Sequence, residues 1–268
     1  MPTAPLLRLL AAVGAGGFAL TYAVALHTGW GLHADAALYR RVSGNPSFPV
    51  TTAGERALAT IDVGTVAAVA LLLAFLALAR GRVARAGAAV FVVASSVASA
   101  ELVKHGLPHV AHGLPVGRPP TFPSGHTSVA VSLGLALLIA VPRVARPVAA
   151  LVGAAYAAGI AVSVVVLGWH YPSDTVGSFF ICTFWAAVAG IALRDVPSRP
   201  RLSKAGVALA LGPVAVGLVI AVAIAQRHPG AVELVRSRRA LLATAAVLGL
   251  VSVCVFAAFT PLVDERAQ

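Results

Sequence analysis

Long apolar runs separated by short polar stretches are the feature that most constrains how this chain folds. Runs of about 20 residues recur along the sequence, long enough for a helix to cross a hydrocarbon core about 30 Å thick. Backbone polar groups inside lipid must be paired within their own segment, so such runs are expected to be helical. The sequence therefore predicts an all-α, polytopic membrane helical bundle.

Composition and charge support this interpretation. Hydrophobic residues make up 59% of the 268 residues and charged residues only 11%, whereas about a quarter of a soluble domain is charged. The net charge of +11 raises the question of nucleic acid. However, the Arg residues stand between apolar runs and form no basic tract with interleaved aromatics, so no nucleic-acid partner is expected. Basic loops suit an anionic membrane surface better.

We expect a single membrane domain over residues 1–268. Charged residues and Pro/Gly clusters divide the apolar runs into spans at about 9–27, 57–79, 86–106, 125–142, 148–169, 175–193, 206–225 and 240–262. The longest polar connections are 28–56 and 107–124. The first run ends in Ala23-Val24-Ala25, which resembles a signal-peptidase site. The run is longer than a usual signal-peptide core, so a retained first helix is the favoured interpretation.

The sequence Pro123-Ser124-Gly125-His126 stands directly before an apolar run and indicates the start of a helix. Gly125 allows close backbone approach, and the first N–H groups of a helix have no partner within it. Such an end carries partial positive charge and is a natural phosphate site, with His126 at its rim. An ordinary capped helix start with an interfacial histidine explains the tetrapeptide equally well.

A second motif, His170-Tyr171-Pro172-Ser173-Asp174, joins the fifth and sixth spans. Pro172 stops the fifth helix, and Ser173 or Asp174 can cap the sixth. The turn lets the Asp174 carboxylate reach the Nδ1–H of His170, which fixes the tautomer and leaves the Nε2 lone pair for nucleophilic or basic chemistry. The alternative is a capped helix beside a chance interfacial histidine.

Two cations accompany these motifs. Lys104 ends the third span, and Arg118 stands shortly before the Pro-Ser-Gly-His sequence. Beside a helix N-terminus they would neutralise phosphate oxygens. Each is also explained as a residue that snorkels to the membrane interface, and Glu101 lies one turn from Lys104 as an ion-pair partner.

Other ionisable residues are assigned no chemistry. His105, His109 and His112 share the spacing of one helix face, but Pro108 interrupts that helix, so no metal is expected. Asp62, inside the second expected span, is either a support for the site or, as we favour, a buried polar contact between helices.

In combination and in this order, the motifs resemble those of the type-2 phosphatidic acid phosphatase family, which includes bacterial undecaprenyl-diphosphate and phosphatidylglycerophosphate phosphatases. The resemblance covers about residues 57–194. In the segment SVVVLGWHYPSD, the residues at the positions of the family's third motif are Ser163, Gly168, His170 and Asp174. The resemblance implies a six-helix phosphatase-like core. The last two expected spans, over about residues 206–262, lie outside it and are extra C-terminal helices.

The resemblance also implies a hydrolase that removes phosphate from a lipid without a metal or other cofactor. His170 would form a phosphohistidine, Asp174 would orient it, and His126 would act first as an acid and then as a base. A covalent intermediate splits one difficult displacement into two easier ones. The phosphoryl oxygens would be held by Lys104, Arg118 and the backbone N–H groups of Ser124, Gly125 and His126.

The sequence departs from the family pattern at two places. The family has Arg directly after the Ser of the third motif, where this chain has Val164. It also spaces its Lys six residues before Arg-Pro, and the corresponding position here is Ala111. His109 and His112 lie in this altered stretch and are candidate substitutes for the missing cation.

Lys and Arg in the loops set the expected orientation. With the N-terminus inside, eleven of the 20 lie on the inner side and nine on the outer, and the loop 226–239 opposes the bias. The bias is clearer up to the sixth span once Lys104 and Arg118 are set aside as site residues. We therefore expect a multi-pass protein of the cell membrane with its site on the extracytoplasmic face.

The leading prediction is a membrane phosphatase for phosphatidic acid, phosphatidylglycerophosphate or a polyprenyl phosphate or diphosphate. The sequence specifies neither the lipid nor the oligomeric state. An inactive or slow relative that binds lipid headgroups is the alternative, because of Val164 and the stretched first motif. A transporter ranks third, since the ionisable residues gather at one membrane face and a conduction path needs some near the middle. Haloperoxidase chemistry ranks last, because relatives of that kind are soluble.

Overall fold

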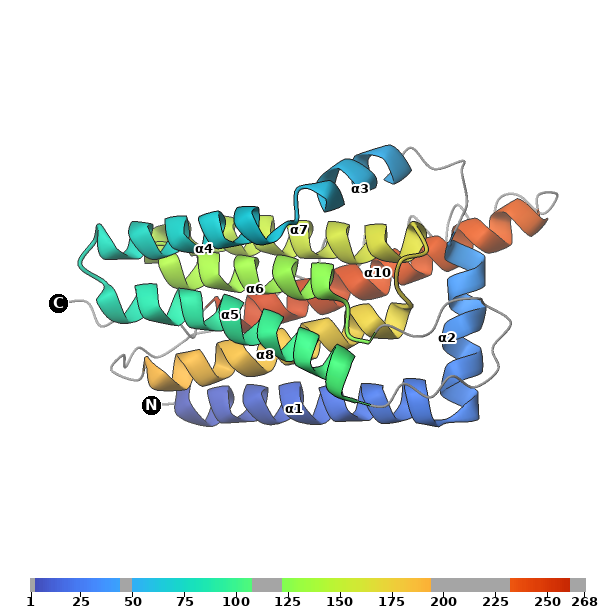
Figure 1. Cartoon of the computed structure of the whole chain (residues 1–268), viewed down its shortest axis with the longest axis horizontal. Coiled ribbons are helices and arrows are strands. Elements are labelled where there is room, and N and C mark those ends of the chain that lie inside the picture. The colour runs from blue at the N-terminus through green and yellow to red at the C-terminus, as the bar shows by residue number, and fades with distance from the viewer. Residues whose placement is uncertain (1–2, 44–49, 108–121, 194–231, 261–268) are drawn as a thin grey trace.

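The computed structural model describes residues 3–43, 50–107, 122–193 and 232–260 as a helical bundle (Figure 1). The helices are α1 (Thr3–His27), α2 (Gly29–Val42), α3 (Val50–Ala59), α4 (Val63–Leu78), α5 (Val83–Gly106), α6 (Gly125–Ala140), α7 (Arg146–Val166), α8 (Pro172–Ala192) and α10 (Val232–Phe259), with a short 3-10 turn at Arg143–Ala145. All regular structure in these ranges is helical, which confirms the predicted fold class.

Five helices are long and apolar enough to cross a membrane. They lie at Pro5–His27, Val83–Gly106, Arg143–Val166, Pro172–Ala192 and Arg239–Phe259, and the shorter apolar helices are α4 and α6. The chain is thus a multi-pass membrane protein, as its apolar runs predict. The span expected at 206–225 lies outside the described residues.

The stretch 28–56, expected as a polar connection, contains two helices. The hydroxyl of Thr28 accepts the Gly31 N–H at 3.0 Å and so caps α2, which buries Leu32 and Ala36 among other residues. In Figure 1, α2 runs crosswise at the end of the bundle where α1 ends. Its narrow buried stripe among charged residues explains why the sequence suggested a loop.

The second expected span, 57–79, is also divided, because α3 ends at Ala59 and α4 begins at Val63. Asp62 stands at this break and is exposed, so the expectation of a buried contact between helices was wrong. Its carboxylate caps α4 by accepting the Thr65 N–H at 3.0 Å and the Thr65 hydroxyl at 2.6 Å. The one span residue that favoured a transporter therefore lies at a helix end.

Helix α6 is the central element of the bundle. Almost all of its residues are buried, and it packs against α5, α7 and α8. Its N-terminus points to the α2 end of the bundle, where α8 also begins (Figure 1). At the opposite end, Arg80 and Arg85 donate to the carbonyl groups of Ala140 and Ile139, which places cations at the negative end of the helix dipole.

Helix α10 is built into this bundle. The Phe256 ring enters a notch between α6 and α7 that exists because Gly134 and Gly153 have no side chains: an ideal Cβ on Gly153 would lie 2.4 Å from the ring. The Ser252 hydroxyl also donates to the Ala154 carbonyl at 2.8 Å. The last described helix therefore contributes to the core, although it lies outside the stretch that carries the motifs.

Gly153→Ala tests this notch. The added methyl group overlaps the buried Phe256 ring, and we expect a loss of about 1–3 kcal/mol in the free energy of unfolding. Thermal unfolding of the detergent-solubilised protein measures the change. Gly159→Ala in the same helix is the matched control, because nothing lies within 4 Å of its added Cβ. The control is expected to be neutral or stabilising, since Ala favours helix over Gly by about 1 kcal/mol. Equal effects of the two changes would contradict the notch.

Candidate active site

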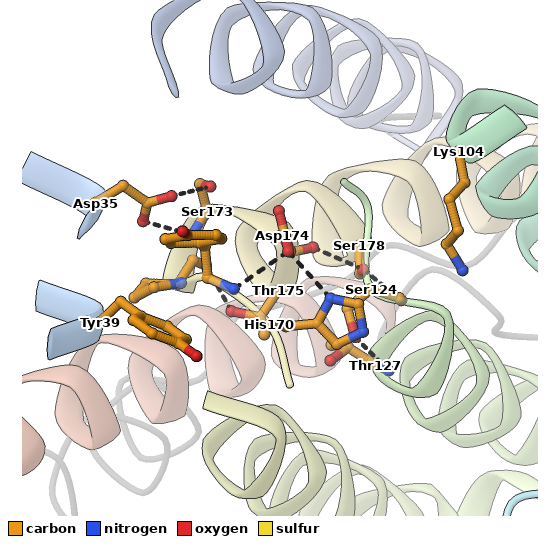
Figure 2. Close-up of polar contacts among 12 residues, drawn as sticks. Asp35, Tyr39, Lys104, Ser124, Thr127, His170, Ser173, Asp174, Thr175 and Ser178 are labelled. Carbon is orange, nitrogen blue, oxygen red and sulfur yellow. Dashed lines mark hydrogen bonds and ion pairs between the residues drawn. The ribbon is translucent and has the colours of Figure 1, made fainter. Parts of the chain in front are cut away.

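The site is built where the N-termini of α6 and α8 are joined. The Ser124 N–H donates to the Asp174 carbonyl oxygen at 3.0 Å. The Ser178 hydroxyl, one turn further along α8, lies 2.8 Å from the Ser124 carbonyl and 2.9 Å from the Asp174 carbonyl (Figure 2). These three residues fix the two motifs of the sequence against each other.

The Pro-Ser-Gly-His sequence starts α6 as predicted. Buried Ser124 is the N-cap, and its hydroxyl accepts the Thr127 N–H at 3.3 Å. Because the Ser124 N–H donates to Asp174 and the Thr127 N–H to the Ser124 hydroxyl, the N–H groups left here for an anion are those of Gly125 and His126, and the expected contribution of Ser124 is not available. The preceding Phe122 is fully buried against Gly177, where a Cβ would lie 2.4 Å from its ring.

The second motif forms the expected contact between a histidine and an aspartate. The Nδ1 atom of His170 lies 3.0 Å from Oδ2 of Asp174, which also accepts the Tyr171 N–H at 3.2 Å. His170 is 9% exposed and Asp174 is 0% exposed. A buried carboxylate at this distance favours the tautomer with the proton on Nδ1 and stabilises positive charge on the ring.

A tight reversal of the chain presents His170 to the site. Helix α7 ends at Val166, and the N–H groups of Trp169 and His170 both donate to the Val164 carbonyl, at 2.8 and 3.1 Å. Gly168 has a φ of +71°, a conformation that a side chain disfavours. Pro172 then begins α8, with no loss of a hydrogen bond in the first turn.

His126 lies at the same place. It is half-buried, and its ring is 5.5 Å from the ring of Trp169, the immediate neighbour of His170. The structure therefore brings the two predicted histidines to one end of the bundle, although 44 positions separate them in the sequence.

Lys104 also reaches the start of α6. A Cβ atom built on Gly125 would lie 3.3 Å from Lys104 Nζ and 3.2 Å from Glu101 Oε1, so the ends of both side chains lie close to this glycine. Lys104 Nζ donates to Glu101 Oε1 at 2.7 Å, the pairing considered from the sequence. A helix N-terminus thus meets the ion pair of Lys104 and Glu101 at Gly125, where the Lys104 ammonium and the first N–H groups of α6 are the donors available to an anion.

Other residues singled out in the sequence lie outside the described ranges or away from this arrangement. Arg118, Ala111, His109 and His112 lie outside the described residues. His105 is exposed and lies 3.6 Å from a Glu101 oxygen. Among the described ranges, no group of three or more His, Cys, Asp or Glu side chains is arranged to hold a metal ion.

Val164, where the family has Arg, is 0% exposed. Its side chain belongs to an apolar cluster with Val42, Leu58 and Leu241, from α2, α3 and α10. The backbone of Val164 supports the His170 turn, but its side chain supplies no charge to the site.

Two residues of α2 that the sequence did not suggest also contact the second motif. The carboxylate of Asp35 accepts the Ser173 N–H at 3.1 Å and the Ser173 hydroxyl at 2.5 Å (Figure 2). The Tyr39 hydroxyl donates to the Gly168 carbonyl at 2.9 Å. The only signal in the sequence was a capping Thr28 ahead of a weak apolar stripe, which did not indicate where the helix would pack.

The environment of Asp35 makes its carboxylate unusually basic. Burial raises the pKa of Asp35 from 3.8 to about 7; the Ser173 hydroxyl lowers it and the charge of nearby Asp174 raises it further. Because the folded-state pKa is raised, the folded protein holds this proton more tightly than the unfolded chain between about pH 4 and pH 7. Asp35 therefore makes folding less favourable as the pH rises through this window.

Asp35→Asn removes this titration. We expect the wild type to lose more thermal stability than the variant when the pH is raised from 5 to 8, by an amount on the order of 1 kcal/mol or more, since one pKa unit corresponds to about 1.4 kcal/mol. Tm values at both pH values, in the same detergent, measure the difference. Parallel pH dependences in the two proteins would show that Asp35 titrates at an ordinary pH.

Comparison with known proteins finds a family match over the stretch of the chain that carries the site. Residues 100–196 match the model of the PAP2 superfamily. No curated protein and no solved structure matches the chain significantly. The matched region begins just before Lys104 and ends just after α8, so it contains both histidine motifs. The chain therefore carries a PAP2 superfamily region, consistent with a member of the type-2 phosphatidic acid phosphatase family.

Proposed function

We propose that this protein is a membrane phosphatase that hydrolyses a lipid phosphate or diphosphate at the extracytoplasmic face, through a phosphohistidine and without a metal ion. The observation that carries the proposal is the buried pair of His170 and Asp174, held at the joined N-termini of two helices. The match to the PAP2 superfamily supports phosphatase chemistry at a coarser level.

In the first step, Nε2 of His170 attacks phosphorus. A nitrogen–phosphorus bond forms and the bond from phosphorus to the departing oxygen breaks; that oxygen belongs to the lipid in a phosphate and to the remaining phosphate in a diphosphate. His126 donates a proton to this departing oxygen. Asp174 keeps the Nδ1 proton in place and stabilises the charge that the ring acquires, because its carboxylate accepts at 3.0 Å.

In the second step, a water molecule attacks the phosphohistidine. His126, now neutral, removes a proton from this water, the new phosphorus–oxygen bond forms, and the bond to His170 breaks. The products are inorganic phosphate and the lipid with one phosphate fewer, and both histidines return to their starting states. The position of His126 beside Trp169, next to His170 in the chain, supports this shared role.

Charge stabilisation in both steps comes from the start of α6. The N–H groups of Gly125 and His126 and the ammonium of Lys104 are the described donors near this point. A pre-oriented donor that acts on the transferring group is worth several kcal/mol in such reactions, about 3–4 kcal/mol for one oxyanion-hole group. We assign Arg118 the same role by its place in the motif order.

The location of this site supports a lipid substrate. The residues of both motifs stand at the ends of apolar helices, so a phosphate on a membrane lipid can reach them from the headgroup layer while its chains stay in the bilayer. The second candidate is a relative that binds a lipid headgroup without turning it over. The fully buried Val164 favours this candidate, because its side chain provides no cation.

Phosphate release from a lipid panel tests the proposal. The detergent-purified protein is given phosphatidic acid, phosphatidylglycerophosphate and polyprenyl diphosphate in the presence of a chelator of divalent metals. We expect release from at least one lipid and a loss of at least about 10³-fold in His170→Ala, since removing a nucleophile leaves only binding and charge stabilisation. His126→Ala is expected to lose about 10²–10⁴-fold, the usual contribution of a general acid and base.

Two controls make this result interpretable. His105→Ala is the matched variant, because His105 is an exposed histidine at the end of α5, outside the proposed catalytic pair, and it should retain wild-type release. Vanadate should inhibit by occupying the transition-state site. Folded wild-type protein that binds the lipids but releases no phosphate would favour the headgroup-binding relative, and undiminished release by His170→Ala would rule out the phosphohistidine.

A further inference from the structure

We propose that Asp35 of α2 is a positioning residue, which holds the Ser173 end of the turn so that His170 is aimed at the phosphoryl group. This inference rests on the proposed function and deepens it. Asp35 lies outside the region that matches the PAP2 superfamily and more than 130 positions from Ser173 along the chain.

The contact is a helix cap supplied by another helix. Ser173 is in the first turn of α8, whose N–H groups have no partner within the helix. Both oxygens of Asp35 are used: Oδ1 accepts the Ser173 N–H at 3.1 Å and Oδ2 accepts the Ser173 hydroxyl at 2.5 Å. Such a two-point contact fixes direction as well as distance.

Two aspartate side chains accept the donors at the start of α8. Asp174 accepts the Tyr171 N–H and contacts His170, while Asp35 accepts the donors of Ser173 (Figure 2). Asp35 therefore satisfies the donors that would otherwise compete for Asp174. With Asp35 in place, the Asp174 carboxylate can remain directed at the His170 ring.

Helix α2 holds the other end of the turn as well. The Tyr39 hydroxyl donates to the Gly168 carbonyl at 2.9 Å, and its ring centroid lies 4.7 Å from that of Tyr171. Asp35 and Tyr39 are four residues apart on one face of α2, so they contact the chain reversal both before and after His170. Loss of either contact should displace the imidazole, and a misplacement of about 1 Å can lower a rate by about 100-fold.

The kinetic test compares Asp35→Ala with Asp35→Asn. Asp35→Ala removes both acceptors, and we expect kcat to fall by about 10-fold or more with KM changed by less than about threefold, because the phosphate-binding groups of α6 are untouched. Asp35→Asn should stay within about threefold of the wild-type kcat. Its amide accepts the Ser173 N–H and donates to the Ser173 hydroxyl, so both contacts survive.

Asp62→Ala is the matched control. Asp62 makes the same pair of contacts, with one N–H and one hydroxyl, but it caps α4, which carries no proposed site residue. Its variant should keep the wild-type kcat although it loses an equivalent cap. Equal losses in Asp35→Ala and Asp62→Ala would show a general effect of lost helix caps and would overturn the inference, as would a wild-type kcat in Asp35→Ala.

A readout independent of activity separates this inference from the proposed function. Acylation of His170 by diethyl pyrocarbonate, followed on its own peptide by mass spectrometry, reports how the ring is held. The His170 ring is 9% exposed in the folded turn. We expect a several-fold faster reaction in Asp35→Ala than in Asp35→Asn or wild type, because loss of the contact should release the turn and expose the ring. Equal rates in all three would overturn the positioning role.

The outcomes of the two measurements are distinct. A wild type without phosphatase activity, combined with faster acylation in Asp35→Ala, rejects the proposed function and keeps the structural role of Asp35 in holding His170. If Asp35→Ala does not fold, Ser173→Ala takes its place. That variant removes only the hydroxyl contact and should lower kcat several-fold with little change in KM, and an unchanged kcat overturns the inference.

Discussion

The hydrogen bond from the Ser124 N–H to the Asp174 carbonyl is the contact on which the rest of the site depends. It joins the N-termini of α6 and α8, which brings two positive helix ends to one place. Like partial charges repel, and the carboxyl groups of Asp174 and Asp35 offset this by accepting the N–H groups of Tyr171 and Ser173 at the start of α8. The start of α6 offers N–H donors to a phosphate group, with the Lys104 ammonium and its partner Glu101 beside them.

Close approach of the helices makes this junction possible. Gly177 leaves room for the Phe122 ring under the start of α6, and Gly125 leaves room for Lys104 and its partner Glu101. Deeper in the bundle, Gly134 and Gly153 admit Phe256 of α10 in the same way. Inside a bilayer no hydrophobic driving force holds helices together, and small residues allow the close packing that does.

Parts of the chain outside the matched region complete the site. Helix α2 holds the turn of His170 by polar contacts, and Leu241 of α10 packs with Val164 at the end of α7. At the position of Val164, where the family has a charged residue, this protein has an apolar contact between helices. The proposed chemistry therefore relies on Lys104 of α5 and on Arg118 as its cations. It also relies on the contacts that α2 makes with the turn of His170.

The sequence by itself determined the helical membrane class, the start of α6, and the pairing of His170 with Asp174, because these follow from apolar length, capping residues and contacts within four positions. It placed the cap of α8 at Ser173 or Asp174, whereas the helix begins at Pro172 with Tyr171 as its N-cap. It did not determine α2, the exposed cap made by Asp62, the contact of Asp35 with Ser173, or the notch for Phe256. Every helix here is apolar, so periodicity does not say which faces meet. Only the tertiary structure decides contacts between residues more than 100 positions apart, because they depend on how whole helices cross and not on any local pattern.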